Sequence, residues 1–527
     1  MSTRILVVEG ITDRGMEVLQ AEGWQVDVRK AMPPQELAEA IPPYHALMIR
    51  SGSQVTAAVL EAATNLRIIG RPGVGVDNVD LEAATRRGIV VMNSPGGNLV
   101  STAELALGLL LACARNIAQA DAGMKAGKWD RKSFAGVELS GKRLGVVGFG
   151  RIGREVAARC QALGMEVVAY DPFVSATAAE RLHVPLVSLD ELLQTSDFIT
   201  LHTTLSRETR HLIGKEALGK VKAGVRIVNA ARGELVDEEA LLAALETGRV
   251  AAAALDVHAQ EPPVDWRLAK HPRVVAMPHC GAATAEAQER VGTDIALQVR
   301  DYLKGGLIQH AVNFFSLTGD LYDQVRPAME LAERLGLFLG QACDGSMERV
   351  EMGLYGDFRE IDAKPILAAA VLGVLKPLVP TATLVNARAV AAERGMEVLE
   401  STSSARVAFS NLMVLRLKTS DTDFSVAGTL FGRNHLRLVD VDGVEVDAIP
   451  QGHLLLVKND DTPGVVGHLG SLLGERAINI ARMTVGRKPG SGRAVMLIEV
   501  DAEVAPETVA AVRRVPGVRE ARAIRLG

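Results

Sequence analysis

Short apolar runs separated by polar, glycine-containing segments dominate the first part of this 527-residue chain. An apolar run bounded by turn residues predicts a buried strand, and its alternation with helical patterns predicts parallel βαβ units. Residues 1–97 therefore predict a parallel sheet with helices on its faces. The predicted strands are Ile5–Val8, Trp24–Val28, Ala46–Ile49, Arg67–Gly70 and Val90–Met92.

A second set of apolar runs between residues 144 and 276 predicts a second doubly wound parallel sheet. Its strands are expected at Leu144–Val147, Glu166–Tyr170, Val184–Val187, Phe198–Leu201, Arg226–Asn229, Ala252–Asp256 and Val274–Ala276. Between the two sets, a long apolar helix is predicted to begin at a capping box, Ser101-Thr-Ala-Glu104, and to reach about Ala126. Its apolar richness suits either a core helix or a subunit interface.

The pattern changes after residue 313. Residues 314–450 predict an α+β domain in which we find no catalytic constellation. Its helical segments are Val325–Gln341 and Lys364–Arg394, and its alternating strands are Leu412–Thr419, Phe424–Phe431 and Leu436–Val441. Residues 451–527 follow a β-α-β-β-α-β order, which predicts a ferredoxin-like unit. Its elements are His453–Lys458, Gly464–Gly474, Ile480–Gly486, Ala494–Val500, Pro506–Arg513 and Glu520–Leu526.

A glycine-rich turn joins the first strand of the second sheet to a helical pattern. Gly148, Gly150 and Gly153 have G-x-G-x-x-G spacing, which permits a tight turn, a close approach to a pyrophosphate and close helix packing. The helix N-terminus then offers free N–H groups to phosphates. Asp171 ends the next strand, where a carboxylate accepts ribose hydroxyls and repels a 2′-phosphate. The segment therefore predicts a site for NAD rather than NADP.

Composition narrows the class of protein further. The formal net charge of −5 argues against a nucleic-acid or anionic-membrane partner. The four cysteines are scattered without Cys-x-x-Cys spacing, so we expect neither disulfides nor a metal site, and a cytoplasmic location. The N-terminus lacks the apolar core of a signal peptide, and the most apolar run, Ala103–Ala114, is too short to span a bilayer.

Polar residues follow the predicted strands of the second sheet, where such folds bind ligands. Arg232 offers a planar fork for a carboxylate. Histidine is the side chain best suited to acid/base work near neutral pH, so His279 fits the removal of a hydroxyl proton. A neighbouring carboxylate such as Glu261 would stabilise a charged imidazole. Each of these residue types alone is more often a surface or packing residue, so their contexts decide the interpretation.

Three segments carry a resemblance to the D-isomer-specific 2-hydroxyacid dehydrogenases. They are Asn229-Ala-Ala-Arg232-Gly-Glu-Leu-Val-Asp237, Asp256-Val-His-Ala-Gln-Glu261-Pro-Pro263 and Pro278-His279-Cys-Gly281-Ala282. The resemblance implies two doubly wound, Rossmann-like domains: a substrate domain of residues 1–97 and 284–313, and an NAD domain of residues 98–283 inserted into it. It also implies that Arg232 binds substrate, His279 is the acid/base and Glu261 its partner.

The same resemblance implies a set of cofactor contacts. Besides the glycine loop and Asp171, they are Arg151, Ile152, Thr203, Ala230, Arg232, Asp256, His279, Gly281 and Ala282.

Within that family, the chain resembles the long form that carries two further C-terminal domains and oxidises D-3-phosphoglycerate in serine synthesis. The implied substrate residues are Arg50, Ser51, Gly52, Arg71, Val74, Gly75, Asn98 and Arg131. Arg50, Arg71 and Arg131 could neutralise the 3-phosphate, although each could equally be a solvated surface charge. The resemblance also suggests a reduction of 2-oxoglutarate.

Asp461-Thr-Pro-Gly464-Val-Val and Ile478-Asn479-Ile480 are similar to segments of ACT regulatory domains. That resemblance implies an amino-acid effector, L-serine, bound between paired ACT domains. Asn459, Asp461 and Asn479 would contact it, although the first segment also has the pattern of an ordinary turn before a helix.

Three alternatives to this function stay open. The chain could be another NAD-dependent dehydrogenase acting on glyoxylate, hydroxypyruvate or a phosphonate, an NAD-sensing transcriptional corepressor, or a structural assembly protein. The apolar helix after Ser101 and an ACT domain both predict a homodimer or homotetramer.

Overall fold

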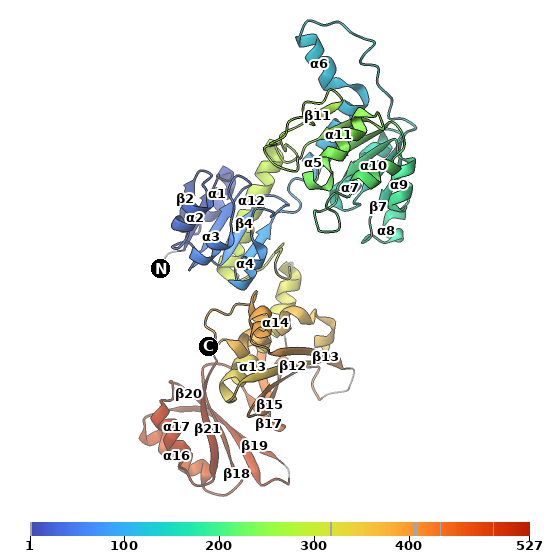
Figure 1. The fold of residues 1–527 in the computed structure, drawn as a ribbon. Helices are drawn as coiled ribbons and strands as arrows, with labels where there is room; N and C mark the ends of the chain where they lie inside the picture. Colours follow the sequence, from blue (N-terminus) through green and yellow to red (C-terminus); the bar gives the residue numbers. More distant parts are fainter. Residues whose placement is uncertain (1–2, 317–318, 404–407, 433, 489, 527) are drawn as a thin grey trace.

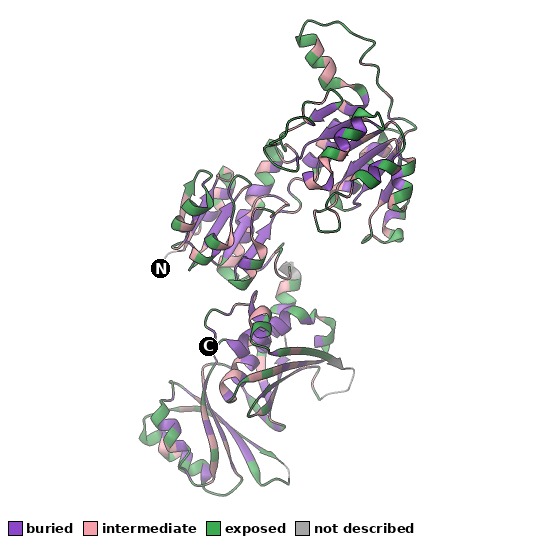
Figure 2. Ribbon diagram, in the orientation of Figure 1, coloured by how far each residue is buried: buried purple, intermediate pink, exposed green. Residues whose placement is uncertain are grey.

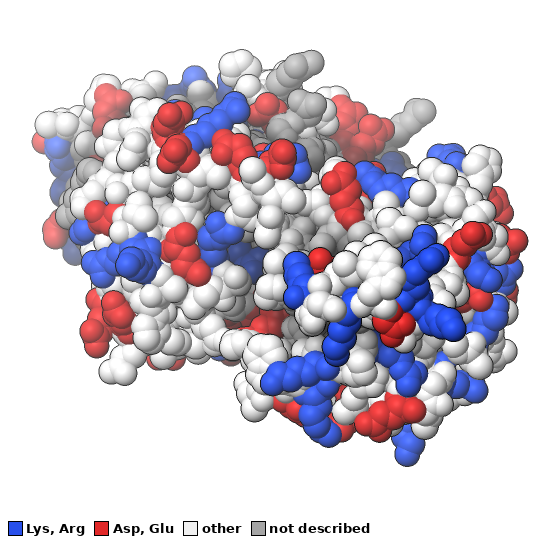
Figure 3. Space-filling view, turned by 90° about the horizontal axis from the view of Figure 1, so that it is seen from above, with Lys and Arg blue, Asp and Glu red and all other residues white. Residues whose placement is uncertain are grey.

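The computed structural model describes residues 3–316, 319–403, 408–432, 434–488 and 490–526. Within them, the chain forms four sheets (Figure 1), two wholly parallel, one mixed and one antiparallel. The predicted fold class is confirmed. Acidic and basic side chains both occur over the face seen from above (Figure 3).

The first sheet has the strand order β2-β1-β3-β4-β5. Its strands are β1 (Arg4–Val8), β2 (Gln25–Arg29), β3 (Ala46–Ile49), β4 (Ile68–Arg71) and β5 (Val90–Asn93). The helices that follow them in sequence are α1 (Asp13–Gln20), α2 (Pro34–Ala40), α3 (Ala57–Ala62) and α4 (Leu81–Arg86). Thr12 and Asp80 cap α1 and α4 by accepting backbone N–H groups.

A helix from much later in the sequence completes this first unit. α12 (Ala285–Gly305) packs on α1 and β4. The two segments that join the first sheet to the second unit lie side by side, because the Arg290 side chain donates to Gly97 O at 3.0 Å. Ser94 Oγ likewise donates to Val291 O at 3.2 Å.

The apolar helix predicted from Ser101 to Ala126 is wrong in two details. It begins earlier, with Asn98 as N-cap, and the Ser101 hydroxyl instead donates to Gly281 O at 2.9 Å. It also breaks at Asn116, which has φ +54°, into α5 (Leu99–Arg115) and α6 (Ile117–Lys125), bent by 66°. Among the described residues, no single helix is long and apolar enough to cross a membrane; only this bent pair meets the criterion, as two pieces.

The second sheet is parallel, with the order β11-β10-β9-β8-β6-β7. Its strands are β6 (Arg143–Val147), β7 (Glu166–Tyr170), β8 (Phe198–Leu201), β9 (Val225–Asn229), β10 (Val250–Leu255) and β11 (Val274–Ala276). Its helices are α7 (Arg151–Ala162), α8 (Ala176–Glu180), α9 (Leu189–Thr195), α10 (Lys215–Lys220), α11 (Glu238–Glu246) and the 3₁₀ turn η1 (Gly233–Leu235). The strand predicted at Val184–Val187 is wrong. Only Leu186 pairs, with Ala169, since Pro185 has no N–H to donate.

The third sheet has the order β13-β12-β14-β15-β16-β17. Its strands are β12 (Met347–Gly356), β13 (Glu397–Ser403), β14 (Asn411–Thr419), β15 (Asp423–Phe431), β16 (His435–Val441) and β17 (Val444–Ala448). The strands β12, β13 and β17 were not predicted. The helices α14 (Ala363–Leu375) and α15 (Ala387–Glu393) were predicted as one helix, which Pro377 and Pro380 forbid.

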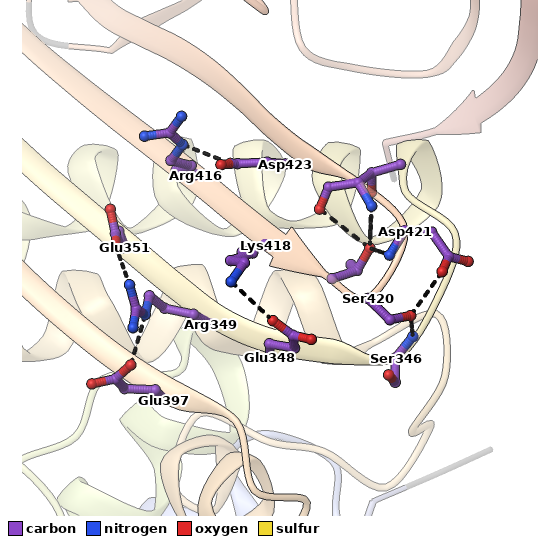
Figure 4. Close-up of polar contacts among 12 residues, drawn as sticks. Ser346, Glu348, Arg349, Glu351, Glu397, Arg416, Lys418, Ser420, Asp421 and Asp423 are labelled. Carbon is purple, nitrogen blue, oxygen red and sulfur yellow. Dashed lines mark hydrogen bonds and ion pairs between the residues drawn. The ribbon is translucent and has the colours of Figure 1, made fainter.

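The two faces of this third sheet differ. One face packs on α13 (Gly319–Ala342) and α14, which cross so closely that a Cβ on Gly336 would lie 2.2 Å from Ala370 O. Figure 4 shows ion pairs among side chains of β12, β13, β14 and β15. These include Arg349–Glu397 at 2.6 Å and Arg416–Asp423 at 2.6 Å, on partly or fully exposed side chains typical of a solvated face.

The last unit has the predicted ferredoxin-like order. It comprises β18 (His453–Asp460), α16 (Val465–Glu475), β19 (Ile480–Lys488), β20 (Arg493–Val500), α17 (Pro506–Val512) and β21 (Val518–Arg525). Its antiparallel sheet has the order β19-β20-β18-β21, with α16 and α17 over one face. The apolar residues of the other face, including Leu454 and Ile524, join the core of the third sheet.

Candidate active site

The glycine loop after β6 has the geometry of a dinucleotide site. Gly148 has φ +91°, and a Cβ there would lie 2.6 Å from the backbone of His202 and Thr203, which follow the neighbouring strand β8. A Cβ on Gly153 would lie 2.1 Å from Gly148 O. Both positions therefore require glycine for close backbone packing. Since β6 and β8 flank the point where the strand order reverses, the loop lies at the crevice where such sheets bind ligands.

The start of α7 leaves room for a phosphate. Gly150 is its N-cap and makes no side-chain capping bond, and nothing lies within 4 Å of the position of its Cβ. Arg151 and Ile152 form the first helical positions. Free N–H groups at an open helix N-terminus attract an anion, so these residues fit the pyrophosphate of NAD.

Asp171 follows β7 and faces this loop. Its carboxylate accepts the Phe149 and Phe173 backbone N–H groups, both at 2.8 Å. Each carboxylate oxygen keeps a further acceptor position, so the residue still fits a ribose diol.

The nicotinamide end of the predicted site is organised by Asp256, which is 1% exposed. Its two oxygens accept the backbone N–H groups of Cys280 at 2.6 Å and Gly281 at 2.9 Å. Ala230 is buried, Thr203 and Ala282 are partly exposed, and all three lie on loops at carboxyl ends of strands or just after them. Asp256 thus fixes the backbone beside His279 rather than facing the solvent.

Glu261 and His279 form a direct hydrogen bond, with 2.6 Å between Glu261 Oε2 and His279 Nδ1. They come from the loops that follow β10 and β11, and both side chains are partly exposed. Burial raises the pKa of Glu261, but the hydrogen bond and charge of His279 and the backbone N–H of His258 outweigh it, so the pKa of Glu261 is lowered. A pocket of about 370 Å³ borders the pair. The bond leaves His279 Nε2 for a substrate.

Arg232 follows β9 and reaches the first unit. Its Nε donates to Asp77 Oδ2 at 3.0 Å, and a Cβ on Gly75 would lie 2.0 Å from its guanidinium. Arg71 is linked to Arg50 through Asn78, which accepts from Arg71 Nε at 3.0 Å and donates to Arg50 O at 2.8 Å. Burial first, and then the charges of Arg232 and Arg50, lower the pKa of Arg71. Three predicted substrate cations are therefore brought into one region, between the two parallel sheets.

The remaining predicted substrate residues differ in their surroundings. Ser51 and Gly52 are exposed, and both Glu9 oxygens accept the Gly52 N–H, at 3.1 and 3.0 Å. Val74 O accepts from Asn93, while Asn98 Oδ1 is buried without a hydrogen-bond partner. Arg131 is exposed on the segment between α6 and β6 (Figure 1), and no described contact joins it to Arg71.

Direct contact unites two of the three predicted catalytic residues. Glu261 touches His279, whereas the Arg232 side chain pairs with Asp77. The backbones are nevertheless adjacent, because a Cβ on Gly233 would lie 1.9 Å from the carbonyl carbon of His258.

Several further residues of this region were not predicted as site residues. Glu9 lies directly after β1. Gln288, on α12, accepts a hydrogen bond from Arg50. Asn78 accepts from Arg71 Nε at 3.0 Å and donates to two backbone carbonyls. Glu9 was detectable as a polar residue at the carboxyl end of a strand beside a switch point, whereas nothing local in sequence links Gln288 to Arg50.

The three predicted effector residues lie in the last unit. Asn459 is 2% exposed, and its Oδ1 has no hydrogen-bond partner. Asp461 pairs with Arg487 at 3.3 Å, and Asn479 donates to Asp501 at 2.6 Å.

Three family models match the chain. They describe the NAD binding domain of D-isomer specific 2-hydroxyacid dehydrogenases (residues 107–281), the intervening domain of D-3-phosphoglycerate dehydrogenase (residues 324–442) and the ACT domain (residues 453–517).

Solved structures resemble the first part of the chain. A glyoxylate reductase from Paecilomyes thermophila has a TM-score of 0.56 and 32% identity, covering 59% of this chain and 98% of its own. A D-lactate dehydrogenase from Aquifex aeolicus, complexed with NAD and lactic acid, has a TM-score of 0.53 and 26% identity, covering 57% and 96%.

Curated relatives match over nearly the full length. D-3-phosphoglycerate dehydrogenase from Archaeoglobus fulgidus is 43% identical, covering 99% of this chain and 100% of its own. The enzyme of that name from Bacillus subtilis is 38% identical, covering 99% of both chains. The chain belongs to the D-3-phosphoglycerate dehydrogenase family.

Proposed function

We propose that the protein is an NAD-dependent dehydrogenase that oxidises D-3-phosphoglycerate to 3-phosphooxypyruvate, the first step of L-serine synthesis. The observation that carries the proposal is the Glu261–His279 hydrogen bond, which lies after the carboxyl ends of strands in the same parallel sheet whose glycine loop fits NAD. The full-length relatives of that name support the choice of substrate.

The acid/base step belongs to His279. With Nδ1 bonded to Glu261, its Nε2 is the atom that takes the proton of the substrate hydroxyl. NAD, bound along the glycine loop, supplies the acceptor for the hydride that leaves C2. Glu261 stabilises the imidazolium that forms and fixes the ring orientation.

The substrate has two anionic ends, and the arginines between the sheets suit them. Arg232 offers two N–H groups in a fixed plane to the carboxylate, once it exchanges its contact with Asp77. Arg50 and Arg71 supply positive charge for the phosphate. Arg131 stays a predicted phosphate ligand, although it lies outside the cluster of Arg50, Arg71 and Arg232.

The test is NADH formation by the full chain with a panel of hydroxy acids. D-3-phosphoglycerate should exceed D-glycerate and glyoxylate-type substrates in kcat/KM, and Arg71→Met should remove about a hundredfold of that preference. Equal loss for phosphorylated and unphosphorylated substrates would reject Arg71 as a phosphate ligand. No turnover of any hydroxy acid would reject the enzyme assignment. Reduction of 2-oxoglutarate is part of the proposal and is followed as NADH loss.

An effector and an assembly complete the proposal. L-Serine would bind at Asn459, Asp461 and Asn479 in ACT domains paired in a homodimer or homotetramer; the unpaired, buried Asn459 Oδ1 supports a polar ligand there. All four cysteines are free, which accords with a cytoplasmic location. Serine titration with parallel activity and light-scattering measurements tests the effector and the assembly together.

A further inference from the structure

A second histidine, His258, lies beside the acid/base pair and lines the same pocket. It is on the loop between β10 and Glu261, and it is 9% exposed, whereas the next residue, Ala259, is exposed. Its main chain is held against the loop of Arg232, because a Cβ on Gly233 would lie 1.9 Å from His258 C and 2.0 Å from His258 O. The residue therefore occupies a fixed, enclosed position.

The side chain of His258 bridges two loops. Its Nε2 lies 3.1 Å from Met277 O. A carbonyl oxygen only accepts, so Nε2 carries the hydrogen and donates. Met277 is two residues before His279, at the end of β11. The imidazole thus connects the loop that carries Glu261 to the segment that carries His279.

The main chain of the same residue holds the other partner. The His258 N–H donates to Glu261 Oε1 at 3.1 Å, while Glu261 Oε2 contacts His279. His279 itself is anchored independently, since its N–H donates to Asp256 O at 2.7 Å. Loss of the imidazole would therefore displace the Glu261 loop more than His279.

We infer that His258 is a positioning residue for the proposed reaction: its Nε2–H···O bond to Met277 holds Glu261 in line with His279. The inference rests on the proposed acid/base role of that pair. Because small displacements of catalytic groups cost much rate, loss of the bond should lower kcat and leave NAD binding intact.

Two substitutions separate the hydrogen bond from the bulk of the ring. His258→Leu removes the donor, and His258→Gln places an amide N–H the same number of bonds from Cβ. We expect His258→Leu to lower kcat about tenfold to a hundredfold, and His258→Gln to recover most of it. The Kd for NADH, followed by fluorescence, should stay unchanged in both. His271→Leu, in the turn before β11 and away from the pair, is the matched control and should keep kcat.

The decisive measurement is a double-mutant cycle with Glu261→Gln. If His258 acts through Glu261, His258→Leu should change kcat less than about twofold in the Glu261→Gln background. The same factor in both backgrounds, or a His258→Gln variant as slow as His258→Leu, would overturn the inference. Should His258→Leu not fold, His258→Asn serves in the same cycle, since its amide is one bond too short for Met277 O.

Failure of the proposed function gives a different result. If Glu261→Gln alone leaves kcat unchanged, the acid/base pair is refuted. If Glu261→Gln lowers kcat while His258→Leu does not, only the role of His258 is refuted.

Discussion

The two parallel-sheet units and the C-terminal half bury their apolar residues in different ways. Among the described residues, each parallel sheet has one cluster on either face, so the first half contains four separate cores. The third sheet, α13, α14 and the inner face of the ACT sheet share one continuous core. Figure 2 shows buried residues along the strands of the two parallel sheets, and a mixture of buried and exposed residues along the strands of the C-terminal half.

The candidate site therefore lies in the half with separate cores, whereas the half with the shared core carries none of the predicted catalytic residues. Separate cores end at loops, and the residues of the candidate site lie on those loops. A shared core makes the intervening and ACT units one body. That body also packs on the first unit, because Leu384 and Val385 belong to the core on one face of the first sheet. Described hydrogen bonds add further links between the two. Tyr322 donates to Gly305 O at 2.9 Å, Thr383 to Gly88 O at 3.2 Å and Asn386 to Arg86 O at 3.1 Å.

The largest effect should come from the loop chemistry of the first half. His279→Ala should lower kcat by about 10³–10⁴-fold, because the hydroxyl proton loses its acceptor, while the unfolding midpoint and NADH binding stay as in the parent. Steady-state kinetics and NADH fluorescence measure this, with His271→Ala as control. Near-parental turnover in His279→Ala would contradict the assignment of the reaction to the loops of the first half.

The next effect probes the shared core. Gly336→Leu forces a side chain into the contact between α13 and α14, where a Cβ would lie 2.2 Å from Ala370 O. We expect a loss of about 2–4 kcal/mol in the unfolding free energy, with the third and fourth sheets lost in one transition. Gly467→Ala, in α16 where nothing lies within 4 Å of the Cβ, should be neutral or slightly stabilising. Urea denaturation followed by hydrogen exchange distinguishes one transition from two.

A smaller effect tests the links between the halves. Thr383→Val removes the hydroxyl that donates to Gly88 O and keeps the shape, so it should weaken this contact by about 1 kcal/mol. Calorimetry should then show the transitions of the two halves further apart, with kcat unchanged. Thr64→Val, which removes a bond to Pro42 O within the first unit, should not change that separation.

The smallest effect concerns an ion pair within the shared body. The hydrogen bond and charge of Arg522 lower the pKa of Asp344, at the end of α13. A lowered native pKa gives stability that is present above the usual value of 3.8 and is lost as pH falls through the native pKa. Asp344→Asn should thus lower the midpoint of the C-terminal transition slightly at pH 7, and approach the parent as the pH falls through the lowered native pKa of Asp344. A difference that grew on acidification would contradict this sign.

The strands of the two parallel sheets were predictable because each is a short apolar run between turn residues. The glycine loop and the residues at the strand ends followed from the same pattern. Two predictions from short sequence patterns failed. The Ser101 hydroxyl donates to Gly281 O and does not cap the helix. Pro185 prevents the strand predicted at Val184–Val187, where only Leu186 pairs. β12 was missed although its buried residues Val350, Met352 and Leu354 alternate with more exposed ones, so the strand pattern was present in the sequence. The contact between Arg232 and Asp77, 155 residues apart, depends instead on tertiary packing.

The two segments that connect the parallel-sheet units, around Gly97 and Arg290, are hydrogen-bonded to each other. Because the two connections are bonded to each other, the two units cannot slide past one another without breaking these bonds. The paired connection therefore restricts how far Arg232, on one unit, can separate from Asp77, on the other.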